Sequence, residues 1–259
     1  MASLGNRAVL LFGGYNGVKD LGDTWRWAQN GWRQIHSYKP KPEERNEHKM
    51  ASLGNGRVVM FGGTRGNNVG ICGDTWLFES TTNNWIQIHY YKPEARNGHA
   101  MSSIGNGGKV VMFGGVGNSG EFLSDSWLFH HESTTTWKWT LLSNQMAPRH
   151  FHAMTNGLFN TIILFGGRAK YQQGRDTTPK DADDTWIITD GCPIGYGGDG
   201  CAACPLGKYK DTTTPLECTP CPANTTTGTT GSKQQSSCLV CAGEDEKTQQ
   251  YSSCFVDLF

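Results

Sequence analysis

The sequence lacks long apolar runs and has no excess of charge of either sign. No apolar stretch approaches the roughly 18 residues of a membrane-spanning helix, and the first residues do not read as a secretory leader. The 23 Lys and Arg residues balance the 23 Asp and Glu residues, so the formal net charge is zero. Without the basic surface typical of nucleic-acid binding, we expect no nucleic-acid partner, and any membrane anchor would lie in regions outside this chain.

The common motifs of catalysis are also missing. The chain has no Walker-type phosphate-binding loop, no His-Glu-x-x-His metal motif and no arrangement that predicts a Ser-His-Asp triad. We therefore expect no enzymatic activity, no cofactor and no bound metal. A pair of catalytic carboxylates remains open as an alternative, because a sequence does not show which distant residues lie together.

Cysteine is almost absent from the first 190 residues, where Cys72 is the single example. Cys72 occupies a repeat position that is leucine in neighbouring units, at Leu21 and Leu123, which indicates a buried thiol without a reactive role. The other eight cysteines all follow residue 190. This division predicts two domains, residues 1–190 and residues 191–259.

What the first domain contains is a repeat of about 50 residues. Each unit has an apolar run that ends in a glycine pair, at Gly13-Gly14, Gly62-Gly63, Gly114-Gly115 and Gly166-Gly167. A variable loop and an Asp-x-Trp sequence follow, beginning at Asp23, Asp74, Asp125 and Asp184. A second tryptophan comes next in three units, at Trp32, Trp85 and Trp137.

The apolar runs are short, rich in β-branched residues and bounded by Gly and Asn, which indicates strands covered on both faces. Four strands in about 50 residues make one blade of a β-propeller.

The order of strand, Gly-Gly, loop, Asp-Thr-Trp and second tryptophan resembles the Kelch repeat. The resemblance implies an all-β fold, a Kelch-type β-propeller of which about four blades are visible. Met1-Ala-Ser-Leu-Gly-Asn6 nearly repeats Met50-Ala-Ser-Leu-Gly-Asn55, so the chain opens inside a unit. We therefore expect a piece of a longer protein; the alternative is a compact four-blade ring.

Residues that recur once in each unit are expected to be structural. An arginine and a histidine precede the first strand of a unit, in the series Arg45, Arg96 and Arg149 and the series His48, His99 and His152. A ring of these side chains along the central channel or one rim is the alternative.

His130 lies outside this pattern. With Glu121 and Asp125 it resembles the iron-binding trio of Kelch-type specifier proteins of plants, but four residues rather than three separate Asp125 from His130. One extra residue turns a side chain to the other face of a strand, so we expect no iron site. We expect no galactose-oxidase-like copper site either, because it needs a Cys-linked Tyr, and no Tyr is placed to suggest that link to Cys72.

The second domain is too poor in apolar residues to build a conventional core. It contains three Cys-x-x-Cys sequences, which begin at Cys201, Cys218 and Cys238. Such sequences are typical of zinc sites, but this tail has no histidine and its intervals are rich in Thr, Pro and Gly. We favour disulfides in an oxidising compartment, whose pairing the spacing alone leaves open.

The run Cys204-Pro-Leu-Gly-Lys-Tyr209 resembles the cysteine-rich modules of ephrin-receptor-like, tumour-necrosis-factor-receptor-like and EGF-like ectodomains. The resemblance implies sequential disulfides: Cys192 with Cys201, Cys204 with Cys218, Cys221 with Cys238, and Cys241 with Cys254. It also implies a secreted protein or the ectodomain of a cell-surface protein. In that setting the sequence Asn224-Thr-Thr is a predicted site of N-glycosylation.

The loops after the glycine pairs differ from unit to unit, and variable loops on a rigid scaffold commonly carry recognition. The candidate binding residues in these loops are Tyr15, Arg65, Phe122, Arg168, Tyr171 and Arg175. We predict a non-enzymatic extracellular module that binds a protein or glycan through these loops, with the stapled tail as a spacer. The alternatives are a metal-dependent propeller enzyme, galactose-oxidase-like or iron-dependent, and an intracellular Kelch adaptor with a zinc-binding tail.

Overall fold

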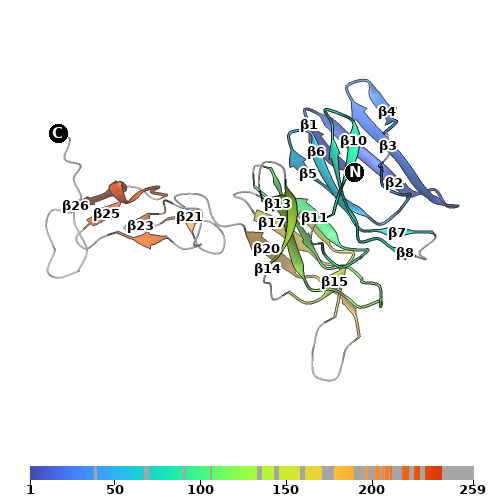
Figure 1. Ribbon diagram of the computed structural model, residues 1–259. Coiled ribbons are helices and arrows are strands. Elements are labelled where there is room, and N and C mark those ends of the chain that lie inside the picture. Colours follow the sequence, from blue (N-terminus) through green and yellow to red (C-terminus); the bar gives the residue numbers. More distant parts are fainter. Residues whose placement is uncertain are drawn as a thin grey trace. The chain divides into compact units, whose positions relative to one another are not determined.

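The structure is a computed structural model of the 259-residue chain (Figure 1). It describes residues 1–37, 40–66, 70–89, 92–105, 107–132, 136–142, 146–157, 161–170, 178–189, 196–197, 202–204, 206, 208–209, 211, 218–221, 225–227 and 231–240. The chain divides into two compact units, Met1–Asn156 with Ile162–Trp186, and Gly157–Thr161 with Ile187–Phe259. The described residues contain many short strands and a single 3-10 turn, η1 (Gln235–Ser237). None of them forms a helix with the length and apolarity of a membrane span.

Four antiparallel sheets follow one another along the chain, and we call them blades 1 to 4. Blade 1 contains β1 (Ala2–Gly5), β2 (Ala8–Tyr15), β3 (Asp20–Ala28) and β4 (Gly31–Ile35). Blade 2 contains β5 (Lys49–Gly54), β6 (Arg57–Phe61), β9 (Thr75–Glu79) and β10 (Asn84–Ile88). Blade 3 contains β11 (Ala100–Ser103), β12 (Lys109–Phe113), β13 (Ser126–His131) and β14 (Trp137–Leu142). Blade 4 contains β16 (Ala153–Asn156), β17 (Thr161–Phe165) and β20 (Thr185–Thr189). The all-β fold expected from the sequence is confirmed.

Short strands form small separate sheets beside the blades or lie in the second unit. The first group comprises β7 (Thr64–Arg65), β8 (Gly70–Ile71), β15 (Arg149–His150), β18 (Arg168–Ala169) and β19 (Lys180–Asp181). The second group comprises β21 (Tyr196–Gly197), β22 (Ala202–Ala203), β23 (Lys208–Tyr209), β24 (Thr219–Pro220), β25 (Thr225–Thr227) and β26 (Cys238–Val240).

The apolar core lies between successive blades. Val58 and Met60 on β6 pack with residues of blade 1, whereas Val59 and Phe61 on the same strand pack with residues of blade 3. Alternate residues of a strand point to opposite faces, so one unbroken apolar run supplies both cores. This explains why the strands are apolar throughout rather than alternating.

A tryptophan on the fourth strand joins blade 2 to blade 1, and another joins blade 3 to blade 2. The indole N–H of Trp85 donates to Oγ1 of Thr24 at 3.1 Å, and its ring meets the edge of Phe12 at 5.4 Å between centroids. Trp85 is paired with Phe78 on the neighbouring strand and is 2% exposed. The second tryptophan of the repeat is therefore a contact between blades.

In blade 3 the equivalent residue is Trp139. It is paired with Phe129 as Trp85 is with Phe78, its N–H donates to Oγ1 of Thr75 at 2.9 Å, and its ring meets Phe61. The sequence pattern gives Trp137 as the second tryptophan of this unit, but Trp139 is the one that makes this contact. The two residues are two positions apart and share a face of the strand, so only the pairing register distinguishes them.

A buried arginine ties neighbouring blades together. The backbone N–H of Arg96 donates to Cys72 O, and its carbonyl accepts from the N–H of Gly63, both in blade 2. The side chain instead binds blade 3: Nη1 and Nη2 donate to the two carboxylate oxygens of Asp125 at 2.6 and 2.7 Å. Gly62 must be glycine at this contact, because its φ is +69° and a Cβ would lie 2.5 Å from the Arg96 carbonyl oxygen.

The same arrangement recurs with Arg45 and Asp74 and with Arg149 and Asp184. In each case the Asp also accepts a hydrogen bond from the indole N–H two residues later. Hydrogen bonds from Arg149 lower the pKa of Asp184 to about 2. The predicted structural role of the Arg series and of the Asp-x-Trp sequence is thereby explained.

The histidine series is buried beside the same junctions. His99 is fully buried against the edge of the Phe61 ring, and neither of its ring nitrogens has a hydrogen-bond partner among the described residues. Burial, followed by the charge of Arg45 or Arg149, lowers the pKa of His48 and His152 to about 3, and that of His99 falls well below its usual value. These imidazoles are therefore neutral in the folded protein.

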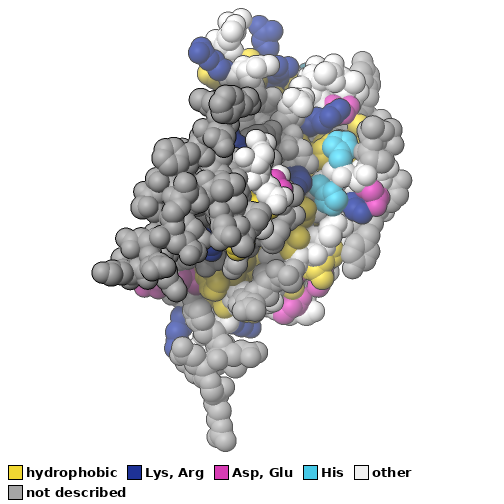
Figure 2. Space-filling model, turned by 90° about the vertical axis from the view of Figure 1, so that its left-hand side faces the viewer, with side chains coloured by type: hydrophobic (Ala, Val, Ile, Leu, Met, Phe, Trp, Pro, Cys, Tyr) yellow, Lys and Arg dark blue, Asp and Glu magenta, His cyan; other side chains and the backbone are white. Residues whose placement is uncertain are grey.

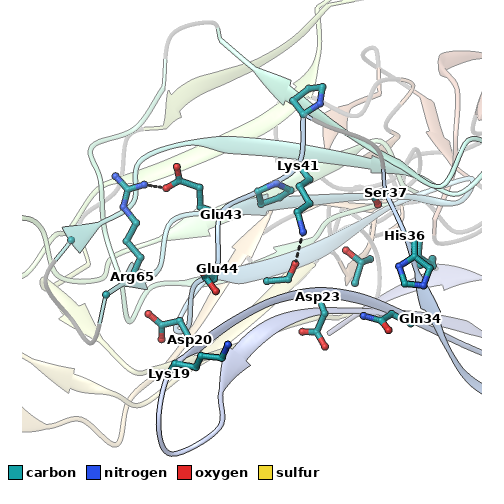
Figure 3. A pocket seen from close by; sticks show the side chains of 17 residues that line it. Lys19, Asp20, Asp23, Gln34, His36, Ser37, Lys41, Glu43, Glu44 and Arg65 are labelled. Atoms are coloured by element: carbon teal, nitrogen blue, oxygen red, sulfur yellow. Dashed lines mark hydrogen bonds and ion pairs between the residues drawn. The ribbon is translucent and has the colours of Figure 1, made fainter.

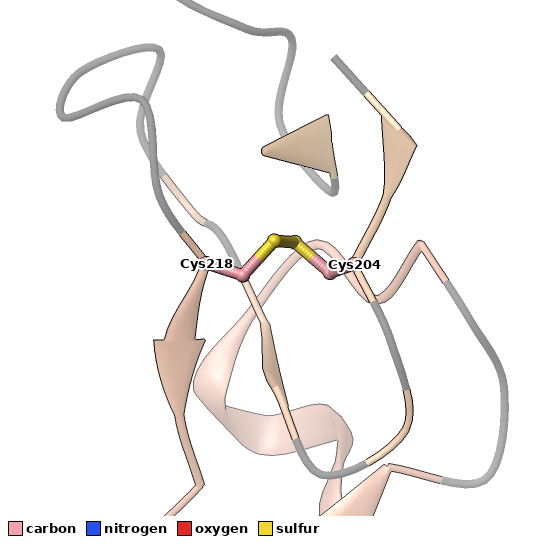
Figure 4. The surroundings of a disulfide bond; sticks show 2 residues. All are labelled: Cys204 and Cys218. Carbon is pink, nitrogen blue, oxygen red and sulfur yellow. A yellow bond between two sulfur atoms is a disulfide. The ribbon is translucent and has the colours of Figure 1, made fainter. Parts of the chain in front are cut away.

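The second unit is stapled by a disulfide between Cys204 and Cys218 (Figure 4), with Cα atoms 5.7 Å apart. The pairing implied by the receptor-like resemblance is confirmed for these two residues. Cys221 is also disulfide-bonded. The zinc alternative is wrong for these three cysteines, because an oxidised sulfur cannot act as a thiolate ligand. The remaining predicted positions, namely Cys192, Cys201, Asn224, Cys241, Cys254 and the side chain of Cys238, lie outside the described residues.

Removal of the buried arginine should be far more costly than removal of an exposed one. Arg96→Leu leaves the Asp125 carboxylate without its partner, so we expect the free energy of unfolding to fall by about 3 kcal/mol or more. The control Arg57→Leu removes an ion pair whose arginine is 41% exposed, which should change stability by less than about 1 kcal/mol. Urea denaturation followed by tryptophan fluorescence measures both, and equal losses would contradict the assigned role.

The buried histidines should make stability depend on pH. Above the ordinary histidine pKa of about 6.5, these histidines are neutral in both the folded and the unfolded state. Below that pH they become protonated in the unfolded chain, whereas in the folded protein the buried rings stay neutral. Stability should therefore be complete above about pH 6.5 and fall toward the folded-state pKa values, by up to about 1.4 kcal/mol per pH unit for each histidine. Urea denaturation at several pH values measures this slope, which His99→Leu should reduce; a flat profile would show that the rings titrate normally.

Candidate protein-binding surface

The variable loops are short β-hairpins beyond the glycine pairs. In blade 1 the hairpin is the end of β2 and the start of β3, where Tyr15 pairs with Asp20. Oδ1 of Asn16 accepts hydrogen bonds from the N–H groups of Val18 and Lys19 and closes its turn. In blade 2 the hairpin is β7 and β8, and in blade 3 it is formed around a bridge between residues 116 and 122. The turns of the blade 1 and blade 3 hairpins are thus closed by hydrogen bonds of their own, the latter through Gly117 and Gly120.

Asn46, in the connection between blades 1 and 2, joins their two hairpins. Its Nδ2 donates to Oδ1 of Asp20 at 2.5 Å, and its Oδ1 accepts from Oγ1 of Thr64 at 2.8 Å. Asp20 and Thr64 are 5% and 1% exposed. Two buried side chains from different blades are thus held by one amide, so the edges of the space between the hairpins are fixed.

A groove of about 1480 Å³ lies beside this junction (Figure 3). Its walls come from the blade 1 hairpin, the end of β4, the connection at 40–44 and the β7–β8 hairpin. The charged residues that line it are Lys19, Asp20, Asp23, Lys41, Glu43, Glu44 and Arg65. Figure 3 shows Arg65 and Glu43 in an ion pair across the groove wall and Lys41 pointing to a backbone carbonyl, that of Gly22.

The groove suits a polypeptide segment that carries both charges. Its volume exceeds the roughly 300–1,000 Å³ of most small-molecule pockets. Arg65 and Glu43 are 52% and 66% exposed, so their ion pair is weak and can exchange for charges of a partner. Lys19 and Glu44 also line the groove, so its walls carry further charges of both signs.

A second cluster lies where blade 3 meets blade 4. The ring of Phe122 packs against His150 with 4.4 Å between centroids, and Nζ of Lys170 lies 4.7 Å from the Phe122 centroid. Phe151, 62% exposed, also contacts His150. Burial and then the charge of Arg168, which pairs with His150 across β15 and β18, lower the pKa of this histidine. The cluster offers an aromatic, basic contact of the kind enriched in interfaces.

The predicted binding residues do not form one site. Arg65 lines the groove, Phe122 and Arg168 belong to the second cluster, and Tyr15, 54% exposed, lies outside the groove lining. Tyr171 and Arg175 lie outside the described residues. Sequence reasoning missed Phe151 and Lys170. Phe151 could have been found from the sequence, because the equivalent positions in the other units are Glu47 and Gly98, and an aromatic residue there departs from the repeat.

Two side chains of the iron-like trio, those of Asp125 and His130, are engaged in other contacts. Asp125 is held by Arg96 and Trp127, and Nε2 of His130 is within hydrogen-bond distance of Oγ1 of Thr140. In the described part of the chain, no three or more His, Cys, Asp or Glu residues are grouped so as to hold a metal ion. On the face shown in Figure 2, the described basic and acidic side chains are interspersed with apolar ones and with histidines.

Comparison with known proteins finds two kinds of likeness, one to a receptor module and one to Kelch proteins. A family model described as tyrosine-protein kinase ephrin type A/B receptor-like matches residues 192–238. An F-box/kelch-repeat protein of Arabidopsis thaliana is 29% identical over 196 residues, which cover 70% of this chain and 40% of that protein. Kelch domain-containing protein 3 of Homo sapiens is 31% identical over 110 residues, 40% of this chain and 28% of that protein. Kelch domain-containing protein 1 of Mus musculus is 33% identical over 94 residues, 36% of this chain and 22% of that protein.

The solved structure of YjhT has a similar fold, with a TM-score of 0.55 and 15% identity over 80% of this chain and 70% of that one. Successive sheets that pack face to face, together with the structural similarity to YjhT, define the fold as a β-propeller built from repeats. The resemblance to Kelch-repeat proteins is confirmed, and so is the resemblance of residues 192–238 to an ephrin-receptor-like module. The chain spans 40% or less of the length of each of these three Kelch relatives.

The amide that joins the two hairpins should matter more than an amide that closes a turn. Asn46→Ala removes the donor to the buried Asp20 carboxylate, so we expect a loss of about 2 kcal/mol in the free energy of unfolding. Asn16→Ala, in the exposed turn, should cost less than about 1 kcal/mol. Urea denaturation of both variants tests this, and a neutral Asn46→Ala would mean that the groove edges are not fixed by this contact.

Proposed function

We propose that this chain is a non-enzymatic, extracellular protein-binding module whose Kelch region holds its partner in the groove between blades 1 and 2. The observation that carries the proposal is the groove itself, with fixed edges and a lining of both charges. A protein segment with alternating Lys or Arg and Asp or Glu side chains would complement that lining.

An extracellular role is supported by the covalent chemistry of the tail. The Cys204–Cys218 disulfide and the oxidised Cys221 are features of an oxidising compartment. The ephrin-receptor-like match supports the same setting. In this proposal the disulfide-bonded tail is a spacer, and the strands that end in glycine pairs form the scaffold.

The ion pairs made by the carboxylates of the Asp-x-Trp sequences support a binding role rather than catalysis. Asp74, Asp125 and Asp184 are all paired to buried arginines. Their charge is already neutralised within the fold, which leaves them unsuited to proton transfer at neutral pH.

The binding proposal is tested by selecting peptides from a random library displayed on phage against the folded chain 1–259. The selected peptides are then synthesised and titrated by calorimetry. The double variant Lys41→Glu, Arg65→Glu should weaken their binding by about tenfold or more, because it replaces complementary charges by repelling ones. The control Lys138→Glu changes an exposed lysine of blade 3 that is paired with Glu132, and it should leave the affinity unchanged.

Two results would defeat the proposal. Peptides that bind equally well to the groove variant would place the site elsewhere, and enrichment of glycans instead of peptides on arrays would change the class of partner. The extracellular part is tested separately by intact mass before and after reduction of protein secreted from eukaryotic cells. A gain of mass on reduction supports it, whereas free thiols with bound zinc would favour the intracellular adaptor.

A further inference from the structure

The junction of blades 3 and 4 is built from different side chains than the junction of blades 1 and 2. At the earlier junction the amide of Asn46 binds the side chains of Asp20 and Thr64. The residues at the equivalent positions of the later junction, in the same order, are His150, Phe122 and Arg168. Hydrogen bonds between polar side chains are thus replaced there by aromatic rings and a cation.

The imidazole of His150 takes the place of that amide but is held by ring packing. Its centroid lies 4.4 Å from that of Phe122 and 4.5 Å from that of Phe151. Neither of its ring nitrogens has a hydrogen-bond partner among the described residues. The second cluster is therefore an aromatic group, in contrast to the polar contact around Asn46.

The backbone at Phe151 suits glycine better than phenylalanine. Its φ is +55°, and the equivalent residues Glu47 and Gly98 have φ values of +53° and +60°. The repeat therefore requires a left-handed residue here, which glycine supplies without strain and a bulky residue does not. The N–H of Phe151 donates to Gly98 O at 2.7 Å, a bond that any side chain at this position would allow. The phenyl ring is thus not needed for the local fold, and such strain is typical of sites used for function.

Two cations lie beside these rings. Nζ of Lys170 is 4.7 Å from the centroid of Phe122, and Arg168 is exposed on the strand that pairs with His150. Asp181 is the backbone partner of Arg168 across β18 and β19. In the part of the chain that the structure describes, neither cation forms an ion pair with a carboxylate. Both charges are therefore available to a partner.

The sign of the charge also differs between the two junctions. Two acids of the earlier junction, Asp20 and Glu47, are replaced at the later one by Phe122 and Phe151. The position of Arg168 carries no charge at the earlier junction. The second cluster has thus lost negative charge and gained positive charge, which complements an acidic partner.

We propose that the second cluster binds an acidic, apolar segment of a protein partner. The rings of Phe122 and Phe151 pack against an apolar side chain of the segment. Arg168 and Lys170 pair with Asp or Glu side chains beside it. A sulfated glycan fits less well, because it would offer the two rings no apolar side chain. The inference is independent of the groove and of the partner bound there.

A depleted phage selection tests the second cluster apart from the groove. A random peptide library displayed on phage is first passed over the chain with Lys170→Glu, which removes peptides that bind other surfaces, and is then selected on the unaltered chain 1–259. We expect the surviving peptides to combine Asp or Glu with Leu, Ile or Phe. Titrated by calorimetry as synthetic peptides, they should bind about tenfold or more weakly to Lys170→Glu. The control Lys138→Glu makes the same change of charge on blade 3 and should leave the affinity unchanged.

Phe151→Gly separates binding from folding. Removal of the exposed ring should weaken the same peptides by about tenfold or more. The midpoint of urea denaturation should not fall, because glycine adopts the left-handed backbone without strain. The control Ile86→Ser, at an apolar position of blade 2 that is 42% exposed, should leave the affinity unchanged.

Three results would overturn the proposal. The first is a selection that yields no surviving peptides, or only peptides without Asp and Glu. The second is a lower urea midpoint for Phe151→Gly with unaltered peptide binding, which would give the ring a purely structural role. The third is retention on heparin that Lys170→Glu abolishes, in the absence of surviving peptides, which would make a sulfated glycan the partner of the second cluster.

Discussion

The structure depends on a charge pair that can exist only between assembled blades. The guanidinium of Arg96 is 0% exposed, and an unpaired charge in such a place costs several kcal/mol. Its backbone is bonded to blade 2 while its side chain is bonded to Asp125 of blade 3. Both blades must therefore be in place for either partner to be satisfied. The pair fixes the spacing and register of neighbouring sheets, and the apolar side chains of the cores fill the space between those sheets.

Because the junctions hold the blades, the hairpins beyond the glycine pairs are free to differ. Asn46 fixes the positions of two such hairpins through Asp20 and Thr64, and this contact leaves the outer charged residues of the groove uncommitted. Exposed pairs such as Arg65 with Glu43 contribute little to folding, so they can be used for recognition. The groove and the aromatic, basic cluster around Phe122 are thus two different surfaces, and both are formed by variable hairpins on the same rigid interior.

The sequence by itself determined the strands and the blade pattern, because each depends on residues close together in the chain or on a fixed period. The Cys204–Cys218 pair was implied by the resemblance to receptor-like modules, since the spacing of the cysteines alone leaves their pairing open. It did not determine that Trp139 rather than Trp137 joins blades 2 and 3, since both share one strand face and only the pairing register selects between them. It also did not show that Phe122 meets Lys170, or which loop residues border a groove. Those contacts join segments that are distant in sequence, and only the packing of one blade against the next brings them together.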